Sequence, residues 1–281
     1  MKKLLPLVSV VITTKDEEKN IENCLISIRK QTYENIEIIV VDNNSSDKTK
    51  QISKKYTKNV YNKGPERSAQ RNYAVFMSSG EYFLQLDADQ ILKKRVVEEC
   101  VNKVNEFKNS SVSRSYKDVA LHIPEVIIGG SFLNKVRNYE KGFYNNTVID
   151  CSRFISKKIF EKVGGYDLRM TGPEDWDLDN KIRKLCFIST INEPFLHNEE
   201  DISLIKLIKK KNYYANGMNL FLDKWKNNQY TKKRLGFYYR YFLVFIENKK
   251  WKKIFKNPLL FLVMYSIRIL IGFIFFINKL R

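Results

Sequence analysis

Two aspartates two positions apart, Asp87 and Asp89, follow directly after an apolar run at residues 82–86. If this run is a buried strand, its carboxyl end is where open α/β sheets place their ligands. Side chains two residues apart in an extended backbone point to the same side, so both carboxylates can address one hard cation. The same D-x-D spacing also occurs in solvated turns, and the pair alone leaves both interpretations open.

Two further places in the chain carry residues with matching chemistry. Glu174 and Asp175 follow a Thr-Gly-Pro turn and open a predicted helix, and His197 lies in a loop after Pro194. A carboxylate can take the proton from a hydroxyl nucleophile, and a neutral imidazole can complete the coordination shell of a metal. Each has a structural alternative, because acidic residues favour a helix N-terminus through the helix dipole and a lone loop histidine is often a packing residue.

The elements that must position these residues alternate between strand-like and helix-like patterns. In chain order they are a strand at 7–13, a helix at 17–30, strands at 36–41 and 59–61, a helix at 67–77, a strand ending at 87 and a helix at 94–107. Such alternation predicts a mostly parallel sheet with helices on both faces, in which the strand ends meet at one edge. The chain is less regular up to residue 149, and a further strand is expected at 187–191. The sequence therefore predicts that the carboxylates and the histidine share one pocket.

Positive charge is concentrated at the C-terminal end of the 281-residue chain. Residues 1–201 hold 32 Lys and Arg against 29 Asp and Glu, whereas residues 202–281 hold 18 against 2, which gives net charges of +3 and +16. A basic segment of this kind can bind nucleic acid, anionic lipid head groups or phosphorylated substrates. The charge avoids the predicted sheet and follows an apolar tail, which favours a membrane surface and leaves a nucleic-acid-binding protein as a distant alternative.

The apolar tail extends over residues 259–277 and is interrupted by Ser266 and Arg268. Nineteen helical residues span about 28 Å, close to the thickness of a hydrocarbon core. Arg268 near the middle would cost about 2.5–3.5 kcal/mol on insertion, which argues against a simple lipid-exposed span. An interfacial helix with nearby lysines on anionic head groups and a helix packed on the protein's own core are both open alternatives.

The cysteines predict a reduced compartment. The four of them form no C-x-x-C pair and lie among apolar residues, which indicates small core side chains rather than a zinc site. Together with the tail, they place the protein at the cytoplasmic face of a membrane, either peripheral or with one C-terminal membrane segment.

Several ordered motifs resemble the family 2 glycosyltransferases, enzymes of the GT-A fold that use nucleotide-sugar donors. The likeness covers about residues 5–215 and rests on VSVVITTKDE at 8–17, VVDNNSSD at 40–47, AQRN at 69–72 and the segments 80–89 and 164–178. It implies an α/β GT-A fold, in which a Rossmann-like, mostly parallel mixed sheet is flanked by helices and followed by a basic, apolar helical tail. The domains expected are a catalytic domain at 1–215 and a helical, membrane-associating region at 216–281.

The resemblance implies a donor site at the first two strand ends. Thr13 and Glu17, after the first strand, and Asp42, after the second, match positions that hold the nucleotide base and ribose. Arg71 matches a basic residue near the base and phosphates. An alternative for Asp42 is that it merely caps the next helix.

The resemblance also implies a metal site and a catalytic base. Asp87 and Asp89 match the D-x-D motif, with Asp89 the more direct ligand of Mn²⁺ or Mg²⁺, and His197 matches a histidine that reaches the metal. Asp175 matches the acidic residue that serves as base, and Glu174 beside it helps to shape the acceptor site.

The reaction implied is metal-dependent, inverting transfer of the hexosyltransferase type, from a nucleotide-diphosphate sugar to a hydroxyl of a lipid-linked or membrane-presented glycan. Residues 209–214 depart from the Q-x-x-R-W motif of the processive members of the family, which favours transfer of a single sugar. The main alternative is a polyprenyl-phosphate sugar synthase, whose acceptor phosphate is already ionised and needs no base. We expect no nucleic-acid partner.

Overall fold

The computed structural model describes residues 5–200, 202–215 and 217–280, with the side chains of residues 210–212, 215 and 274–280 excepted. A seven-stranded sheet in the order β3-β2-β1-β4-β8-β6-β9 forms its centre. β1 runs parallel to β2 and β4, and β6 runs parallel to β9, while β8 is antiparallel to both of its neighbours. The predicted mostly parallel, mixed sheet is confirmed. The strands are β1 Val8–Thr14, β2 Ile36–Asp42, β3 Val60–Asn62, β4 Tyr82–Asp87, β6 Asp118–His122, β8 Phe154–Ser156 and β9 Cys186–Thr190.

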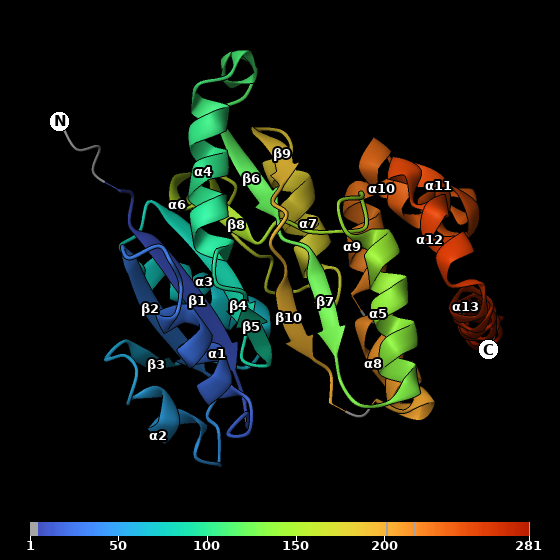
Figure 1. Cartoon of the computed structure of the whole chain (residues 1–281), viewed down its shortest axis with the longest axis horizontal. Coiled ribbons are helices and arrows are strands. Elements are labelled where there is room, and N and C mark those ends of the chain that lie inside the picture. The colour runs from blue at the N-terminus through green and yellow to red at the C-terminus, as the bar shows by residue number, and fades with distance from the viewer. Residues whose placement is uncertain (1–4, 201, 216, 281) are drawn as a thin grey trace.

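Helices cover both faces of this sheet (Figure 1). Alternate residues of β1 enter different cores, because successive side chains of a strand point to opposite faces. Val10 packs with α1 and α4, whereas Val11 packs with α3, α6 and α7. These helices are α1 Ile21–Arg29, α4 Val96–Lys108, α3 Arg67–Met77, α6 Lys157–Lys162 and α7 Glu174–Ile182, with the short α2 Thr49–Ser53 and η1 Ser111–Arg114 beside them.

Three predictions of local structure were wrong. His197 was expected in a loop but lies on the strand β10 (Phe195–Asn198). The first helix begins at Ile21 instead of Glu17, because the backbone N–H groups of Asp16 and Glu17 donate to Ser45 and Thr49 and hold a turn there. The stretch up to residue 149 contains regular structure, namely β6, β7 (Glu125–Ile128) and α5 (Phe132–Tyr144). The two strands are short, and α5 shows few aliphatic residues, so neither has a strong periodic signal.

A second sheet of three strands lies beside the ends of β1 and β4. Its order is β5-β10-β7, with β5 at Gln90–Leu92 and β10 at Phe195–Asn198. β10 pairs antiparallel with β5 and parallel with β7, so His197 stands opposite Gln90 on one side and Ile127 on the other. This pairing brings a residue from late in the chain next to the D-x-D aspartates.

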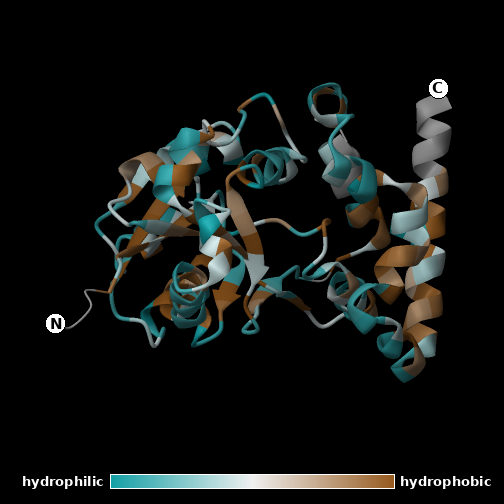
Figure 2. Cartoon of the chain, turned by 90° about the horizontal axis from the view of Figure 1, so that it is seen from above, coloured by the Kyte–Doolittle hydropathy of each residue, from teal (hydrophilic) through white to brown (hydrophobic). Residues whose placement is uncertain are grey.

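The C-terminal third of the chain folds into helices that pack against α7 and α5, to the right of the sheet in Figure 1. α8 ends at Ala215, and the predicted domain boundary there stays a prediction. α13 includes the predicted apolar segment and lies along the outer edge of the molecule in Figure 2. No helix within the described residues has both the length and the apolarity needed to cross a membrane. The elements are α8 Leu204–Ala215, α9 Met218–Trp225, α10 Gln229–Leu235, η2 Tyr239–Leu243, α11 Val244–Ile246, η3 Glu247–Lys249, α12 Trp251–Lys256 and α13 Pro258–Leu280.

Candidate active site

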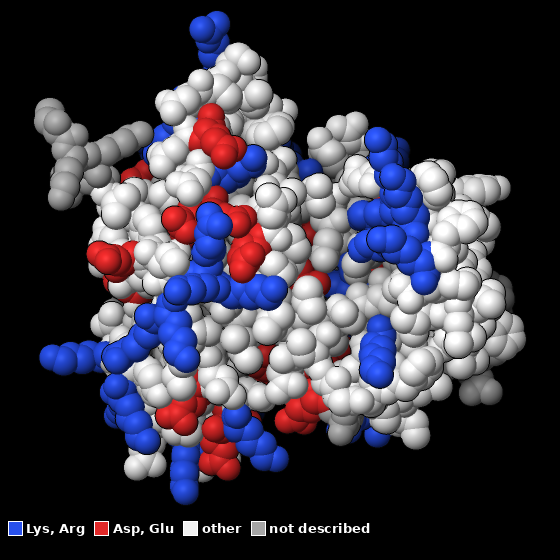
Figure 3. Space-filling model, viewed as in Figure 1, with Lys and Arg blue, Asp and Glu red and all other residues white. Residues whose placement is uncertain are grey.

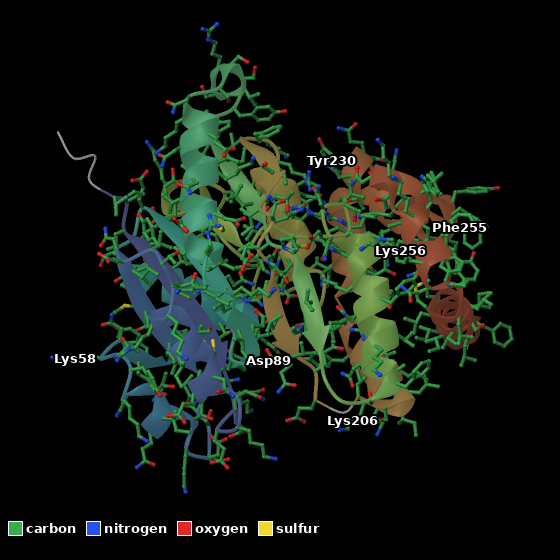
Figure 4. The ribbon with its side chains drawn as sticks, viewed as in Figure 1. Lys58, Asp89, Lys206, Tyr230, Phe255 and Lys256 are labelled. Atoms are coloured by element: carbon green, nitrogen blue, oxygen red, sulfur yellow. The ribbon has the colours of Figure 1, made fainter. Side chains whose placement is uncertain are left out.

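The carboxyl ends of β1 and β4 open into a cavity of about 440 Å³. The two aspartates of the D-x-D motif, the Glu174-Asp175 pair and His197 all line it. Figure 4 shows Asp89 at the lower end of the central sheet, beside β5 and β10. A second cavity of about 560 Å³ adjoins the first and shares Glu17, Asp89 and His197 with it. The structure thus brings together the residues that the sequence predicted to converge.

Arg71 joins the two groups of carboxylates. Its guanidinium is buried and lies 3.1 Å from Asp87 Oδ1 and 3.0 Å from Asp175 Oδ1, with Glu174 Oε1 at 3.7 Å. Burial works to raise the pKa of Asp87, but the charges of Arg71 and Arg67 outweigh it and hold that pKa below its usual range. Asp87 is therefore ionised at neutral pH. The predicted role of Arg71 near the donor phosphates stays a prediction.

The two aspartates of the motif differ in how their oxygens are used. Asp87 accepts hydrogen bonds on both oxygens, from Thr13 Oγ1 at 3.0 Å and from Gln90 Nε2 at 3.3 Å. Asp89 Oδ2 lies 3.1 Å from His197 Nε2, but its Oδ1 is buried and has no hydrogen-bond partner among the described residues. A buried carboxylate oxygen without a partner is unfavourable. Asp89 therefore offers the freer oxygen to a ligand.

His197 lies between two carboxylates. Its Nδ1 is 2.6 Å from Glu125 Oε1 on β7, and its Nε2 faces Asp89. Burial alone would lower the pKa of His197, but the hydrogen bonds with Asp89 and Glu125 raise it to about 9. Glu125 in turn pairs with Lys141 of α5 at 2.7 Å. The sequence offered no signal for Glu125, because only the pairing of β7 with β10 brings it to the histidine.

The donor set fits a divalent ion that is shared with a phosphate ligand. No group of three or more His, Cys, Asp or Glu side chains in the described part of the chain is arranged as a complete metal site. Mg²⁺, however, is usually held by one or two carboxylates together with substrate phosphates and water. Asp89 Oδ1 is buried without a hydrogen-bond partner among the described residues, and His197 Nε2 lies beside Asp89 Oδ2. Asp89 fits such an ion directly, and His197 fits it once the ion displaces the proton that the raised pKa keeps on the ring, whereas the oxygens of Asp87 already have protein partners.

Glu174 and Asp175 begin α7 and face the cavity to different extents. The Asp175 side chain is about a third exposed, whereas Glu174 is buried and its Oε2 has no hydrogen-bond partner within the described residues. Burial and the neighbouring Asp175 raise the pKa of Glu174. The turn before the helix needs Gly172, whose φ is +103° and whose added Cβ would lie 2.3 Å from the Tyr214 carbonyl oxygen.

The predicted donor residues divide into two groups. Thr13 and Glu17 line the cavities. Asp42 is fully buried and lines neither, because its carboxylate accepts from the backbone N–H of Ser45 at 2.8 Å and from the Ser45 hydroxyl. Asp42 thus holds the turn before α2 but does not cap that helix, whose N-cap is Lys48, and its contact with a nucleotide stays a prediction.

The sequence analysis did not identify several charged residues that line the cavity. They belong to no D-x-D or Glu-Asp motif, and Arg137 and Glu125 lie in the stretch that was read as irregular. Positive charge in the cavity is consequently higher than the motifs indicate, which suits a diphosphate ligand. The residues missed are Lys15, Arg67, Glu125, Arg137, Arg153 and Glu199.

Comparison with known proteins gives consistent relatives. The model of the family described as Glycosyl transferase family 2 matches residues 9–164. An uncharacterized glycosyltransferase of Haemophilus influenzae is 27% identical over 254 residues, which cover 76% of each chain.

Two solved structures share the fold at 17% identity. Staphylococcus aureus TarS, residues 1–349 in complex with UDP-GlcNAc, superposes with a TM-score of 0.54 over 79% of this chain and 74% of that one. A mannosyltransferase from Pyrobaculum calidifontis in complex with GDP-Man and Mn²⁺ superposes with a TM-score of 0.56 over 90% and 75%.

Proposed function

The chain belongs to glycosyltransferase family 2, and we propose that it transfers a single sugar from a nucleotide-diphosphate sugar to an acceptor hydroxyl, with inversion at the anomeric carbon. Family membership and the GT-A fold carry the glycosyltransferase activity and the nucleotide-sugar donor. The observation that supports the finer steps is the single cavity in which Arg71 joins Asp87 to Asp175.

Asp175 is the general base of this proposal. Its carboxylate takes the proton of the acceptor hydroxyl while that oxygen bonds to the anomeric carbon, and the bond from that carbon to the diphosphate oxygen breaks on the opposite side. Arg71 lies 3.0 Å from Asp175 and holds its carboxylate at the cavity. Glu174 is buried beside it and shapes the acceptor side of the cavity.

The leaving diphosphate needs positive charge. A divalent ion, Mn²⁺ or Mg²⁺, supplies Lewis-acid stabilisation of that charge when it is bound. Asp89 would hold the ion through Oδ1, with His197 and Asp87 beside it. Thr13, Glu17, Asp42 and Arg71 are the residues to which we assign the donor nucleotide.

The acceptor in this proposal is a lipid-linked or membrane-presented glycan. The helices from α9 to α13 form a basic region with exposed apolar side chains, and we assign to it a peripheral association with the cytoplasmic face of a membrane. A second candidate is a polyprenyl-phosphate sugar synthase. Arg137 and Arg153 at the cavity favour it, because they could bind an acceptor phosphate.

A thermal-shift screen of nucleotide diphosphates and their sugars, with and without Mn²⁺, tests the donor and the metal. A ligand present at 100 times its Kd stabilises the folded state by about 2.7 kcal/mol, which raises the melting temperature measurably. We expect at least one nucleotide to do so only with Mn²⁺, and Asp89→Ala to abolish that dependence. Asp223→Ala, an exposed aspartate of α9, is the matched control. The proposal would be contradicted if none of these ligands raised the melting temperature of the native chain.

A further inference from the structure

We infer that the outer faces of α12 and α13 form a docking surface for an anionic lipid bilayer, with α13 lying in the plane of the head groups. The inference rests on the proposed function for its biological setting, because it specifies the surface and the lipid class through which the enzyme would reach a membrane-borne acceptor. It depends, however, on physical features of the C-terminal helices alone.

α13 has an inner and an outer face. Met264, Arg268 and Ile271 are buried and face inward. The exposed residues recur at intervals of three or four, as expected for one stripe along a helix, and Ser266 is the single polar residue among those described. A contiguous apolar stripe of this length at the edge of a protein marks an interaction surface. Its apolar members, each between 43 and 68% exposed, are Leu259, Leu262, Ile269, Leu270 and Phe273.

Arg268, whose charge argues against lipid contact, points into the protein. Arg268 Nη1 lies 2.7 Å from Glu140 Oε1 of α5, and its Nη2 donates to the Arg240 carbonyl oxygen at 2.8 Å. The guanidinium also lies over the rings of Tyr241 and Phe245. The lipid-facing side of α13 therefore carries no charge between residues 258 and 273, although the sequence has an arginine in the middle of this segment.

The lysines next to α13 also fall into two groups, one that contacts α5 and one that is exposed to solvent. Lys250 and Lys253 donate to carbonyl oxygens at the C-terminal end of α5, including Gly142 and Phe143. Lys249, Lys252 and Lys256 are exposed. Lys252 and Lys256 are four residues apart and therefore lie on one side of α12, whereas Lys249 precedes that helix at the end of η3. Figure 3 shows Lys and Arg side chains gathered over the C-terminal helices with few acidic side chains among them.

This combination identifies the occupant as an anionic bilayer. The sequence contains no Asp or Glu after Glu247, so the surface carries charge of one sign beside its apolar stripe. A second copy packed symmetrically on the same face would bring like charges together, because a two-fold interface is self-complementary. Anionic head groups complement the lysines, and exposed aromatic rings such as Trp251 and Phe255 suit the interface between head groups and chains. Phe255 lies at the outer end of the molecule in Figure 4, far from Asp89.

Flotation of the full chain with phosphatidylcholine vesicles, with and without phosphatidylglycerol, measures this docking. We expect binding to the anionic vesicles and much weaker binding to the neutral ones. Replacing Lys249, Lys252 and Lys256 with Gln should weaken binding roughly 100-fold, since each lysine near the surface contributes about fivefold. The matched control replaces Lys54, Lys55 and Lys58 with Gln at the opposite end of the molecule, where Figure 4 labels Lys58.

A second variant tests the apolar stripe of α13. Leu262→Glu should lower binding to anionic vesicles by roughly tenfold or more, because it removes a leucine from the lipid and adds a repelled charge. Phe76→Glu, at an equally exposed apolar position on α3, is the control and should bind as the native chain does. The inference is overturned if Leu262→Glu floats like the native chain. It is also overturned if the native chain ignores anionic vesicles or forms a dimer that Leu262→Glu dissociates.

Donor binding separates this inference from the proposed function. The Leu262→Glu variant should show the same nucleotide-induced thermal shift as the native chain, because residue 262 is exposed on α13 and lines neither cavity. Loss of flotation with intact donor binding supports the docking surface. Normal flotation of a chain that binds no nucleotide would contradict only the transferase.

Discussion

The 440 Å³ cavity, called the cleft below, and the interface between α7 and the C-terminal helices contain the same acidic residue types in different environments. α7 contributes to both: Glu174 and Asp175 face the cleft, and Asp177 and Asp179 face the C-terminal helices. In the interface each carboxylate has a cationic partner, and Asp179 lies 2.7 Å from Arg183 and 2.9 Å from Arg234. In the cleft, Glu174 also lies near cations, with Arg67 at 3.5 Å, but its buried Oε2 has no hydrogen-bond partner among the described residues. Asp177 Oδ2 in the interface likewise has no hydrogen bond among the described residues, but it lies 2.8 Å from Lys181.

This difference separates a structural carboxylate from a reactive one. A buried acid whose oxygens are satisfied holds elements together, and removing it leaves its cation unpaired. A buried acid with an unsatisfied oxygen is retained at a cost in stability, which is typical of a site that awaits a ligand. Asp89 and Asp87 repeat the contrast at the D-x-D motif, since only Asp89 has such an oxygen.

The largest effect is expected at the cleft end of α7. Asp175→Asn should lower kcat roughly 10²–10⁴-fold, because the amide cannot take the proton of the acceptor hydroxyl. Donor binding should persist, since the thermal shift with nucleotide and Mn²⁺ does not depend on that proton. Turnover with a hydroxyl acceptor and thermal shift on the same preparation measure both, with Asp223→Asn as control. Transfer by Asp175→Asn at the native rate would instead favour the polyprenyl-phosphate sugar synthase.

Substitution at the other end of the helix should destabilise the protein instead of only inactivating it. Asp179→Asn removes the charge that pairs with the buried Arg234, and breaking a buried ion pair costs about 3–5 kcal/mol. Urea denaturation measures this loss in free energy of unfolding. Asp118→Asn is a useful comparison, because Asp118 is half-buried and forms no ion pair within 4 Å in the described structure. A loss at Asp179 no greater than at Asp118 would remove the distinction between the two ends of α7.

The effect of Asp179→Asn should depend on pH. Burial works to raise the pKa of Asp179, but His122, whose Nε2 lies 3.5 Å from Asp179 Oδ1, and the charge of Arg183 lower it below the ordinary value of 3.8. Because the folded pKa lies below the unfolded one, the contribution to stability is present near neutral pH and is lost as pH falls below about 5. The difference in unfolding free energy between native chain and variant should therefore shrink in acid. A difference that stays constant from neutral to acidic pH would contradict this assignment.

The framework of the site could be predicted because its signals are local. The D-x-D pair follows an apolar strand, and the Glu-Asp pair follows a Gly-Pro turn at a helix start. The bounds of α3, which carries Arg71, were predicted to the residue from its helical spacing. Convergence of strand ends at one edge then follows from the parallel sheet, so spatial proximity of Asp89 and Asp175 needed no further information.

The rest could not be predicted because it depends on contacts between distant segments. Glu125 reaches His197 only through the pairing of β7 with β10, two short strands separated by about 70 residues of chain. The direction of Arg268 is likewise invisible in a run of apolar residues, since Glu140 on α5 decides it. Neither pairing leaves a periodic pattern or a spaced motif in the sequence.

The smallest effect is expected at Glu125, which acts through another residue. Its Oε1 holds Nδ1 of His197 at 2.6 Å, so that Nε2 is the ring nitrogen that faces Asp89. Carboxylates that orient a metal-binding histidine in this way typically contribute roughly 10- to 100-fold to metal affinity. Glu125→Gln should therefore weaken Mn²⁺ binding in the presence of nucleotide by about this factor. A Mn²⁺ titration followed by thermal shift measures it independently of turnover.

The matched control for Glu125→Gln is Glu106→Gln, an exposed position whose carboxylate pairs with Lys103 on the surface of α4. This control should leave Mn²⁺ affinity unchanged, because no residue of the cleft contacts that pair. Equal Mn²⁺ affinities for Glu125→Gln and the native chain would place Glu125 with the structural carboxylates of the interface, as a partner of Lys141 alone. A selective loss would instead place it with the cleft, although the sequence contains no motif around it. The titration thus distinguishes a structural role for Glu125 from a role in metal binding at the cleft.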